Sequence, residues 1–127
     1  MHLELFLNEY ALVCTVTGFS VVDITDPSNP YELFFISGSS SIWRDVKTWG
    51  KYAYVTTEAS DGLLIVDLSD QTGQTYVYTE EFFTTSHNIY IDENGYAYIF
   101  GADTGNGGAV ILDLNNDPMN PTVAGVF

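Results

Sequence analysis

Short stretches of alternating or continuously apolar residues fill this chain, and Gly, Pro, Asn and Asp separate them. This pattern is typical of β-strands joined by turns, and no segment has the 3.6-residue period of a helix. In the C-terminal third the pattern predicts strands at 87–92, 96–100, 109–114 and 122–127. The Asn94-Gly95 pair between the first two of these strands predicts a hairpin.

The same four-strand pattern occurs three times. Each repeat has a Tyr-Ala pair, followed by an apolar run that ends in Asp; the alanines are Ala11, Ala53 and Ala97, and the aspartates are Asp23, Asp67 and Asp113. The alanines are 42 and 44 residues apart, and the aspartates are 44 and 46 apart. A period in the forties with only strand-like content is typical of β-propeller blades.

The sequence therefore predicts an all-β fold with about three four-stranded antiparallel blades of the propeller type. The approximate blades are 1–38, 39–84 and 85–127, within one partial propeller that spans 1–127. In the first two blades the predicted strands are 3–7, 10–16, 19–24 and 31–36, then 42–48, 52–57, 63–68 and 76–83. We expect each repeated Asp to fix its turn by accepting backbone N–H groups.

The net charge of the chain argues against some classes of binding partner. The chain has 17 acidic and 3 basic residues, a net charge of −14, which argues against nucleic acid because phosphate binding needs clustered Lys and Arg. No apolar run is long enough for a membrane span, and the N-terminus shows no signal peptide. The acidity is interpreted either as a solvated surface or as a means of binding divalent cations. The single cysteine, Cys14, lies in an apolar strand and is expected to be a buried, inert thiol.

Four polar residues are the best candidates for a ligand site. Aligning the second and third repeats superposes Arg44 and Asp45 on His87 and Asn88. All four fall on the predicted inner strands, which line the channel of a propeller and whose ends form its mouth. Either they bind a small ligand, an ion or a glycan there, or they satisfy one another and the backbone across blades. Trp43, Trp49 and the tyrosines are further candidates for stacking against sugars, although most are expected in the core between blades.

Two loops carry candidate metal ligands. Asp103 and Asn106 stand in a glycine-rich loop, and oxygen ligands of this type suit Ca²⁺. Asp61, in the equivalent loop of the second repeat beside Glu58, is a weaker candidate. An ordinary hairpin loop is the competing interpretation, and Ca²⁺ is the only cofactor that the sequence suggests.

The repeated segments resemble those of the LVIVD-repeat proteins, which are often choice-of-anchor B surface proteins. The matching pieces are residues 63–69, 19–27, 43–48 and 86–92, so the resemblance covers nearly the whole chain. It implies a β-propeller and an extracellular or cell-surface location. It does not imply a reaction, because propellers carry unrelated functions.

Three blades do not close a ring, and each terminal blade would expose an apolar face. We therefore expect a non-enzymatic module that self-associates, as a closed 3+3 ring or a larger assembly, and mediates structural or adhesive interactions, with calcium as a candidate aid. A glycan or a surface protein is a further candidate partner. The alternatives are a propeller enzyme, a carbohydrate-active hydrolase or lyase that acts at the central channel, and a fragment of a longer propeller.

Overall fold

The computed structural model describes residues 2–5 and 8–127, with side chains described from residue 8 onward, and it confirms the all-β prediction. The described strands form three four-stranded antiparallel sheets, which we call blades 1, 2 and 3. Blade 1 contains β1 (His2–Leu5), β2 (Asn8–Thr15), β3 (Gly18–Asp23) and β4 (Tyr31–Ser37). Blade 2 contains β5 (Arg44–Trp49), β6 (Tyr52–Thr57), β7 (Leu63–Asp67) and β8 (Tyr76–Thr79). Blade 3 contains β9 (Asn88–Ile91), β10 (Tyr96–Phe100), β11 (Ala109–Asp113) and β12 (Thr122–Val126).

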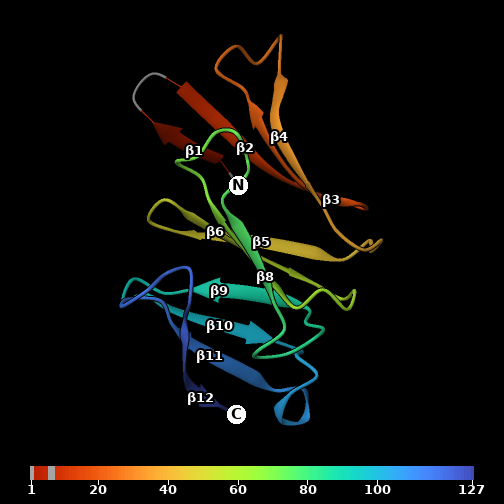
Figure 1. Cartoon of the computed structure of the whole chain (residues 1–127), viewed down its shortest axis with the longest axis vertical. Coiled ribbons are helices and arrows are strands. Elements are labelled where there is room, and N and C mark those ends of the chain that lie inside the picture. Colours follow the sequence, from red (N-terminus) through yellow and green to blue (C-terminus); the bar gives the residue numbers. More distant parts are fainter. Residues whose placement is uncertain (1, 6–7) are drawn as a thin grey trace.

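The three blades follow one another along the long axis of the molecule (Figure 1). Within each blade the strands are paired in the order of the sequence, and the inner strands β5 and β9 of blades 2 and 3 are in contact. This is the meander arrangement of propeller blades. Residues 6–7 of the predicted strand 3–7 lie outside the described residues.

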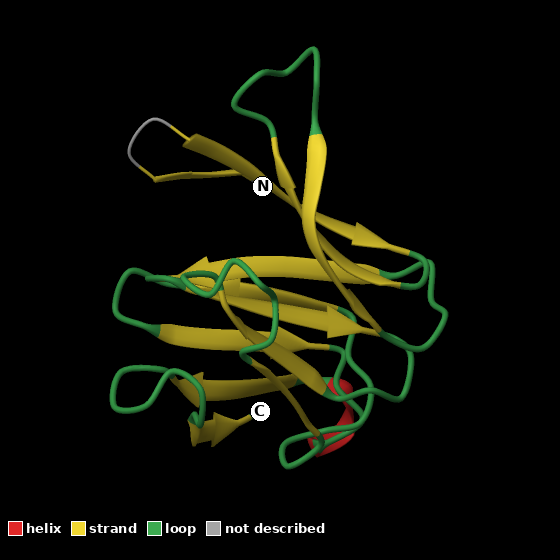
Figure 2. Cartoon of the chain, turned by 45° about the horizontal axis from the view of Figure 1, so that its top comes forward, coloured by secondary structure: helices red, strands yellow, loops and turns green. Residues whose placement is uncertain are grey.

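Two predictions about local structure were wrong. The strand predicted at 76–83 ends at Thr79, because Phe82 and Phe83 leave the sheet and pack into the core, where they are 7% and 3% exposed. The loop before β11, predicted without helix, contains a short 3-10 turn at Gly105–Gly107 (red in Figure 2). Glycines at positive φ on both sides of Asn106 permit this tight turn.

Each blade has two different faces. We call the face toward the preceding blade the leading face and the face toward the following blade the trailing face. In β6 the small residues Ala53 and Val55 point to blade 1 and Tyr54 points to blade 3, because successive side chains of a strand point to opposite sides. Two separate apolar cores result, one between blades 1 and 2 and one between blades 2 and 3. Tyr54 and Ala53 are fully buried.

The expected role of the repeated aspartates is confirmed. In each blade the carboxylate at the end of the third strand accepts a hydrogen bond from the N–H group two residues later: Thr25, Ser69 and Asn115 donate to Asp23, Asp67 and Asp113, each at 2.9 Å. The residue in between donates its N–H to the carbonyl oxygen of the residue just before the repeated Tyr-Ala pair, at 2.8–3.0 Å. The hydrogen bond from the Thr25 N–H is the main cause that lowers the pKa of Asp23. These carboxylates therefore stabilise the turns that position the outer strands.

Cys14 is half-buried and packs against the core between blades 1 and 2. Burial raises the pKa of its thiol to about 11, so the thiolate is scarce at neutral pH. In the described part of the chain, no helix has the length and hydrophobicity needed to cross a membrane.

Candidate functional site

The predicted mouth residues lie where the inner strands begin. Arg44 and Asp45 are the first residues of β5, and Asn88 opens β9 directly after His87. Since β5 and β9 are in contact, blades 2 and 3 contribute to one rim. The four residues nevertheless have very different environments.

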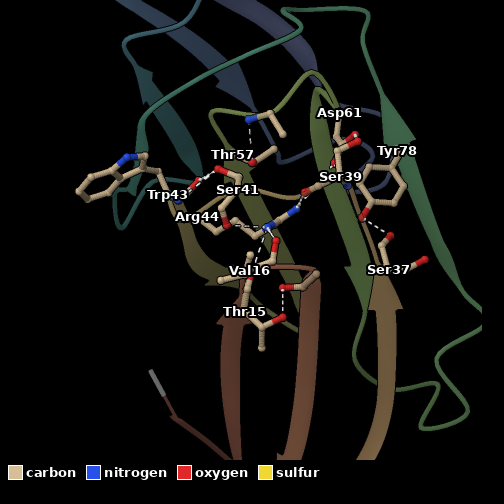
Figure 3. A network of polar contacts seen from close by, with 12 residues as sticks. Thr15, Val16, Ser37, Ser39, Ser41, Trp43, Arg44, Thr57, Asp61 and Tyr78 are labelled. Atoms are coloured by element: carbon tan, nitrogen blue, oxygen red, sulfur yellow. Dashed lines mark hydrogen bonds and ion pairs between the residues drawn. The ribbon is translucent and has the colours of Figure 1, made fainter.

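Arg44 ties blade 2 to blade 1 (Figure 3). Its Nη1 donates hydrogen bonds to the carbonyl oxygens of Thr15 and Val16, both at 2.9 Å, and of Ser41 at 3.2 Å. Its Nη2 donates to the carbonyl of Ser39 and lies 3.8 Å from Asp61 Oδ2. The side chain is 4% exposed. A guanidinium that is buried and satisfied by backbone carbonyls holds a β-turn in place and has little capacity left for a ligand.

Asp45 connects blade 2 to blade 3. Its Oδ2 accepts a hydrogen bond from the backbone N–H of Ile89 at 3.2 Å, and its Oδ1 accepts one from Val46 N–H at 2.9 Å. The ammonium group of Lys47 lies 3.1 Å from Oδ1. The carboxylate thus joins the two inner strands and satisfies the backbone across blades, which is one of the two roles expected for it.

His87, at the position equivalent to Arg44, remains accessible. Its side chain is 55% exposed, its Nδ1 lies 3.7 Å from Glu58 Oε1, and its ring centroid lies 6.2 Å from that of Trp43. Trp43 is itself 55% exposed. We call Trp43, Glu58 and His87 the rim cluster. It combines an open aromatic surface with an imidazole and a carboxylate, a set of groups that can stack on a ligand and exchange hydrogen bonds with it.

Asn88 is exposed and follows His87 directly, so its side chain points to the opposite face of the strand. Trp49, by contrast, packs against the core between blades 2 and 3. From the sequence, Trp43 is one of several candidates for stacking against sugars, and Glu58 is only a neighbour of Asp61. The alignment that superposes Arg44 on His87 was the signal for their proximity, because both residues contact the β-turn region of the preceding blade.

The predicted calcium ligands have a shared structural environment. Asp61 accepts hydrogen bonds from Ser39 N–H and Oγ, both at 2.7 Å. Asp103 accepts hydrogen bonds from Thr84 N–H at 2.9 Å and from the Thr84 hydroxyl. Each aspartate therefore stands in the loop after the second strand of a blade and holds the connection that arrives from the blade before.

These hydrogen bonds, above all the one from the Thr84 side chain, lower the pKa of Asp103. Asn106 lies in the 3-10 turn with φ of 63° and is exposed. Within the described residues, no group of three or more His, Cys, Asp or Glu side chains is placed to hold a metal ion. Calcium binding at Asp61, Asp103 and Asn106 stays a prediction.

Comparison with known proteins agrees with the arrangement of the blades. The LVIVD repeat matches residues 7–36 and 42–78, which together are more than half of the chain. No curated protein matches the sequence of this chain. The match concerns the repeats, and the likeness to choice-of-anchor B proteins stays a prediction. The repeated Asp-terminated strands, their shared turns and this match together establish that the chain belongs to the LVIVD-repeat family.

Proposed function

We propose that this chain is a non-enzymatic propeller module that binds further copies of itself through its two terminal blade faces. The observation that carries the proposal is the contrast between equivalent residues inside and at the ends of the stack. Val55 on the leading face of blade 2 is 2% exposed, whereas Val13 at the same position of blade 1 is 39% exposed. Tyr54 on the trailing face of blade 2 is fully buried, whereas Tyr98 in blade 3 is half-buried. Repeats that cannot cover their own faces gain stability from a neighbour.

The terminal faces differ in a way that favours head-to-tail contact. The trailing face of blade 3 carries large aromatic residues, among them Tyr98 and the exposed Tyr90 and Phe100. The leading face of blade 1 carries the smaller Ala11 and Val13. Large residues also pack against small ones between blades 2 and 3, where Tyr54 and Ala97 share one core. A contact between unlike faces closes into a ring or continues into a filament, according to the angle between blades.

The charge of the chain opposes this contact. Two copies at −14 each repel one another, and salt screens the repulsion over about 10 Å at 0.1 M. Divalent cations would reduce it further, which is the role that we propose for calcium. The proposed setting is extracellular or at the cell surface, where such an assembly would serve structural or adhesive interactions.

The test is the solution mass from light scattering, over a range of protein concentrations, with sodium chloride varied and with calcium present or chelated. A discrete mass of two copies supports a closed ring, and a large polydisperse mass supports a filament. A mass of one copy at all concentrations and salt conditions overturns the proposal. A response to calcium that an equal ionic strength of sodium chloride reproduces would assign the effect to screening alone.

A second function, ligand binding at the rim cluster, is favoured by the exposure of Trp43 beside His87 and Glu58. A saccharide suits these groups, because its C–H faces stack on an indole and its hydroxyl groups pair with a carboxylate and an imidazole. The test is calorimetric titration with a panel of oligosaccharides. Binding that is lost in Trp43→Ala and retained in Tyr76→Ala, a change at an exposed aromatic of β8, supports this function. Absence of binding across the panel contradicts it, and hydrolysis of a titrated sugar would favour the enzyme alternative.

A further inference from the structure

The interface between blades 2 and 3 contains a specific pairing of a tyrosine with a proline turn. The hydroxyl of Tyr54 donates a hydrogen bond of 2.8 Å to the carbonyl oxygen of Pro118. Pro118 belongs to the turn 117–121, which connects β11 to β12. Around this contact Leu114 is fully buried, Pro121 is buried, and Pro118 and Met119 are half-buried.

The same turn occurs in blade 1, without a blade to cover it. Residues 26–30 repeat the Asp-Pro-x-Asn-Pro sequence of residues 117–121. The hydrogen bonds also repeat, since Asn29 N–H donates to the Asp26 carbonyl and Asn120 N–H to the Asp117 carbonyl, both at 3.0 Å. In blade 1, however, every residue of the turn is exposed, including Pro27 and Pro30. Blade 1 thus presents a preformed copy of the surface that Tyr54 contacts in blade 3.

The tyrosine recurs at the opposite end of the molecule. Tyr98 stands between Ala97 and Ile99 as Tyr54 stands between Ala53 and Val55, and each lies opposite an isoleucine of the third strand. Tyr98 is on the trailing face of blade 3 and is half-buried. Its hydroxyl donates to Asp92 Oδ2 at 3.0 Å, within its own blade.

The interface between blades 1 and 2 lacks both partners of the pairing. Leu12 occupies the position of the tyrosine, and the turn of blade 2 at 70–73 contains no proline. Instead, Gln71 Nε2 donates to the hydroxyl of Tyr10 at 3.0 Å. The tyrosine and the proline turn therefore occur together at one internal interface and are both missing at the other. The remaining tyrosine and the remaining proline turn lie on the two faces that would meet between copies.

We propose that the trailing face of blade 3 docks on the leading face of blade 1 in a second copy, with Tyr98 packed against the turn 26–30 of that copy and its hydroxyl bonded to the carbonyl of Pro27. This inference rests on the proposed self-association and adds its register and its direction. Two such contacts between two copies close a six-blade ring.

Docking exchanges the hydrogen bond of Tyr98 to Asp92 for one to Pro27, so the ring of Tyr98 contributes more to affinity than its hydroxyl. Tyr98→Ala is expected to weaken association at least about 30-fold, as removal of a central aromatic anchor does. Tyr98→Phe is expected to weaken it by less than about 10-fold.

The direction of the contact is tested with two variants that each disable one face. Tyr98→Arg places a charge on the trailing face of blade 3, and Ser28→Arg places one on the exposed turn of blade 1. Each variant alone is expected to remain a single copy by light scattering. An equimolar mixture is expected to give a dimer, because the intact turn of the first variant fits the intact tyrosine of the second. Tyr76→Arg, at an exposed position of β8 in blade 2, is the matched control and should associate as the unmodified chain does.

The outcomes separate the two proposals. If the unmodified chain remains a single copy, self-association itself fails. If it associates and the two arginine variants associate equally well, the register proposed here is wrong while self-association stands. If each variant is monomeric and the mixture is monomeric too, the contact is not head-to-tail. Thermal unfolding of both variants shows whether the blades are intact, and Ser28→Arg, at an exposed turn position, keeps the test valid if Tyr98→Arg fails to fold.

Discussion

The interface between blades 1 and 2 and the interface between blades 2 and 3 use the same backbone arrangement but different side-chain ties. At the first, the buried Arg44 donates to carbonyl groups in two separate segments of the chain. At the second, the equivalent His87 is half in solvent, and the ties are the buried Tyr54 and the carboxylate of Asp45. The repeated backbone pattern therefore determines where two blades meet. The residues that differ between repeats determine whether a charged group or an aromatic ring stabilises the interface.

The largest expected effect concerns the second interface. Tyr54→Ala removes a fully buried aromatic ring and leaves the Pro118 carbonyl without its donor. We expect a loss of about 3–5 kcal/mol in the free energy of unfolding. Tyr54→Phe, the matched control, should cost only about 1 kcal/mol. Urea unfolding followed by circular dichroism measures both, and equal losses for the two variants would mean that the hydrogen bond, not the ring, holds the interface.

The next effect concerns the tie at the first interface. Arg44→Ala leaves several carbonyl groups without their donor, and we expect a loss of about 2–4 kcal/mol. Arg44→Lys should recover only part of it, since an ammonium cannot reproduce the planar fork of a guanidinium. The same measurement on His87→Ala should give a change within about 0.5 kcal/mol, because exposed side chains contribute little. Similar losses in the free energy of unfolding for Arg44→Ala and His87→Ala would show that the two interfaces do not differ in this way.

A smaller, pH-dependent effect is expected from the turn of blade 2 at the first interface. Asp70 accepts hydrogen bonds from the side chains of Thr72 and Thr75. These hydrogen bonds, above all the one from Thr72, lower the pKa of Asp70 to about 2. A carboxyl group whose pKa is lower in the folded than in the unfolded chain, where it is about 3.9, stabilises the fold above that value. This stability is lost as the pH falls toward 2.

The variant Asp70→Asn separates this contribution from the general relief of repulsion among acidic groups. Its melting temperature should lie below that of the unmodified chain at pH 7, and the difference should disappear near pH 2. A difference that stays constant over this range would show that packing, and not the charge of Asp70, is responsible.

The smallest effect uses Cys14 as a probe of the first interface. Its thiol is half-buried there and has a pKa of about 11, so alkylation at pH 8 should be slow in the folded chain and fast in urea. Arg44→Ala should accelerate alkylation by loosening blade 1, whereas Tyr54→Phe should leave the rate unchanged. Equal acceleration by both variants would mean that the two interfaces open together.

The sequence predicted the blades because their cause is local. Alternation in β6 and β10, the Asn94-Gly95 hairpin and the Asp-terminated third strands each depend on neighbouring residues. Phe82 and Phe83 were assigned to a strand because apolar residues are typical of strands. Apolar residues are equally typical of loops that pack into a core, and only the packing between blades distinguishes the two cases.

The candidate site was less predictable, since it depends on which blade lies next to which residue. Arg44 and His87 occupy equivalent positions, yet the first is 4% and the second 55% exposed. The difference arises from the connection at 39–41, which surrounds Arg44 and whose path the sequence does not specify. Likewise, Asp61 and Asp103 have the composition of metal ligands, and their hydrogen bonds to Ser39 and Thr84 appear only in three dimensions.

Asp61 and Asp103 also contribute to the resistance of the molecule to mechanical force. Each aspartate holds the connection that enters its blade from the blade before, so a pull on the two ends of the chain loads the two attachments in series. Such a chain would extend in steps of one blade, about 40 residues each, and the weaker attachment would yield first.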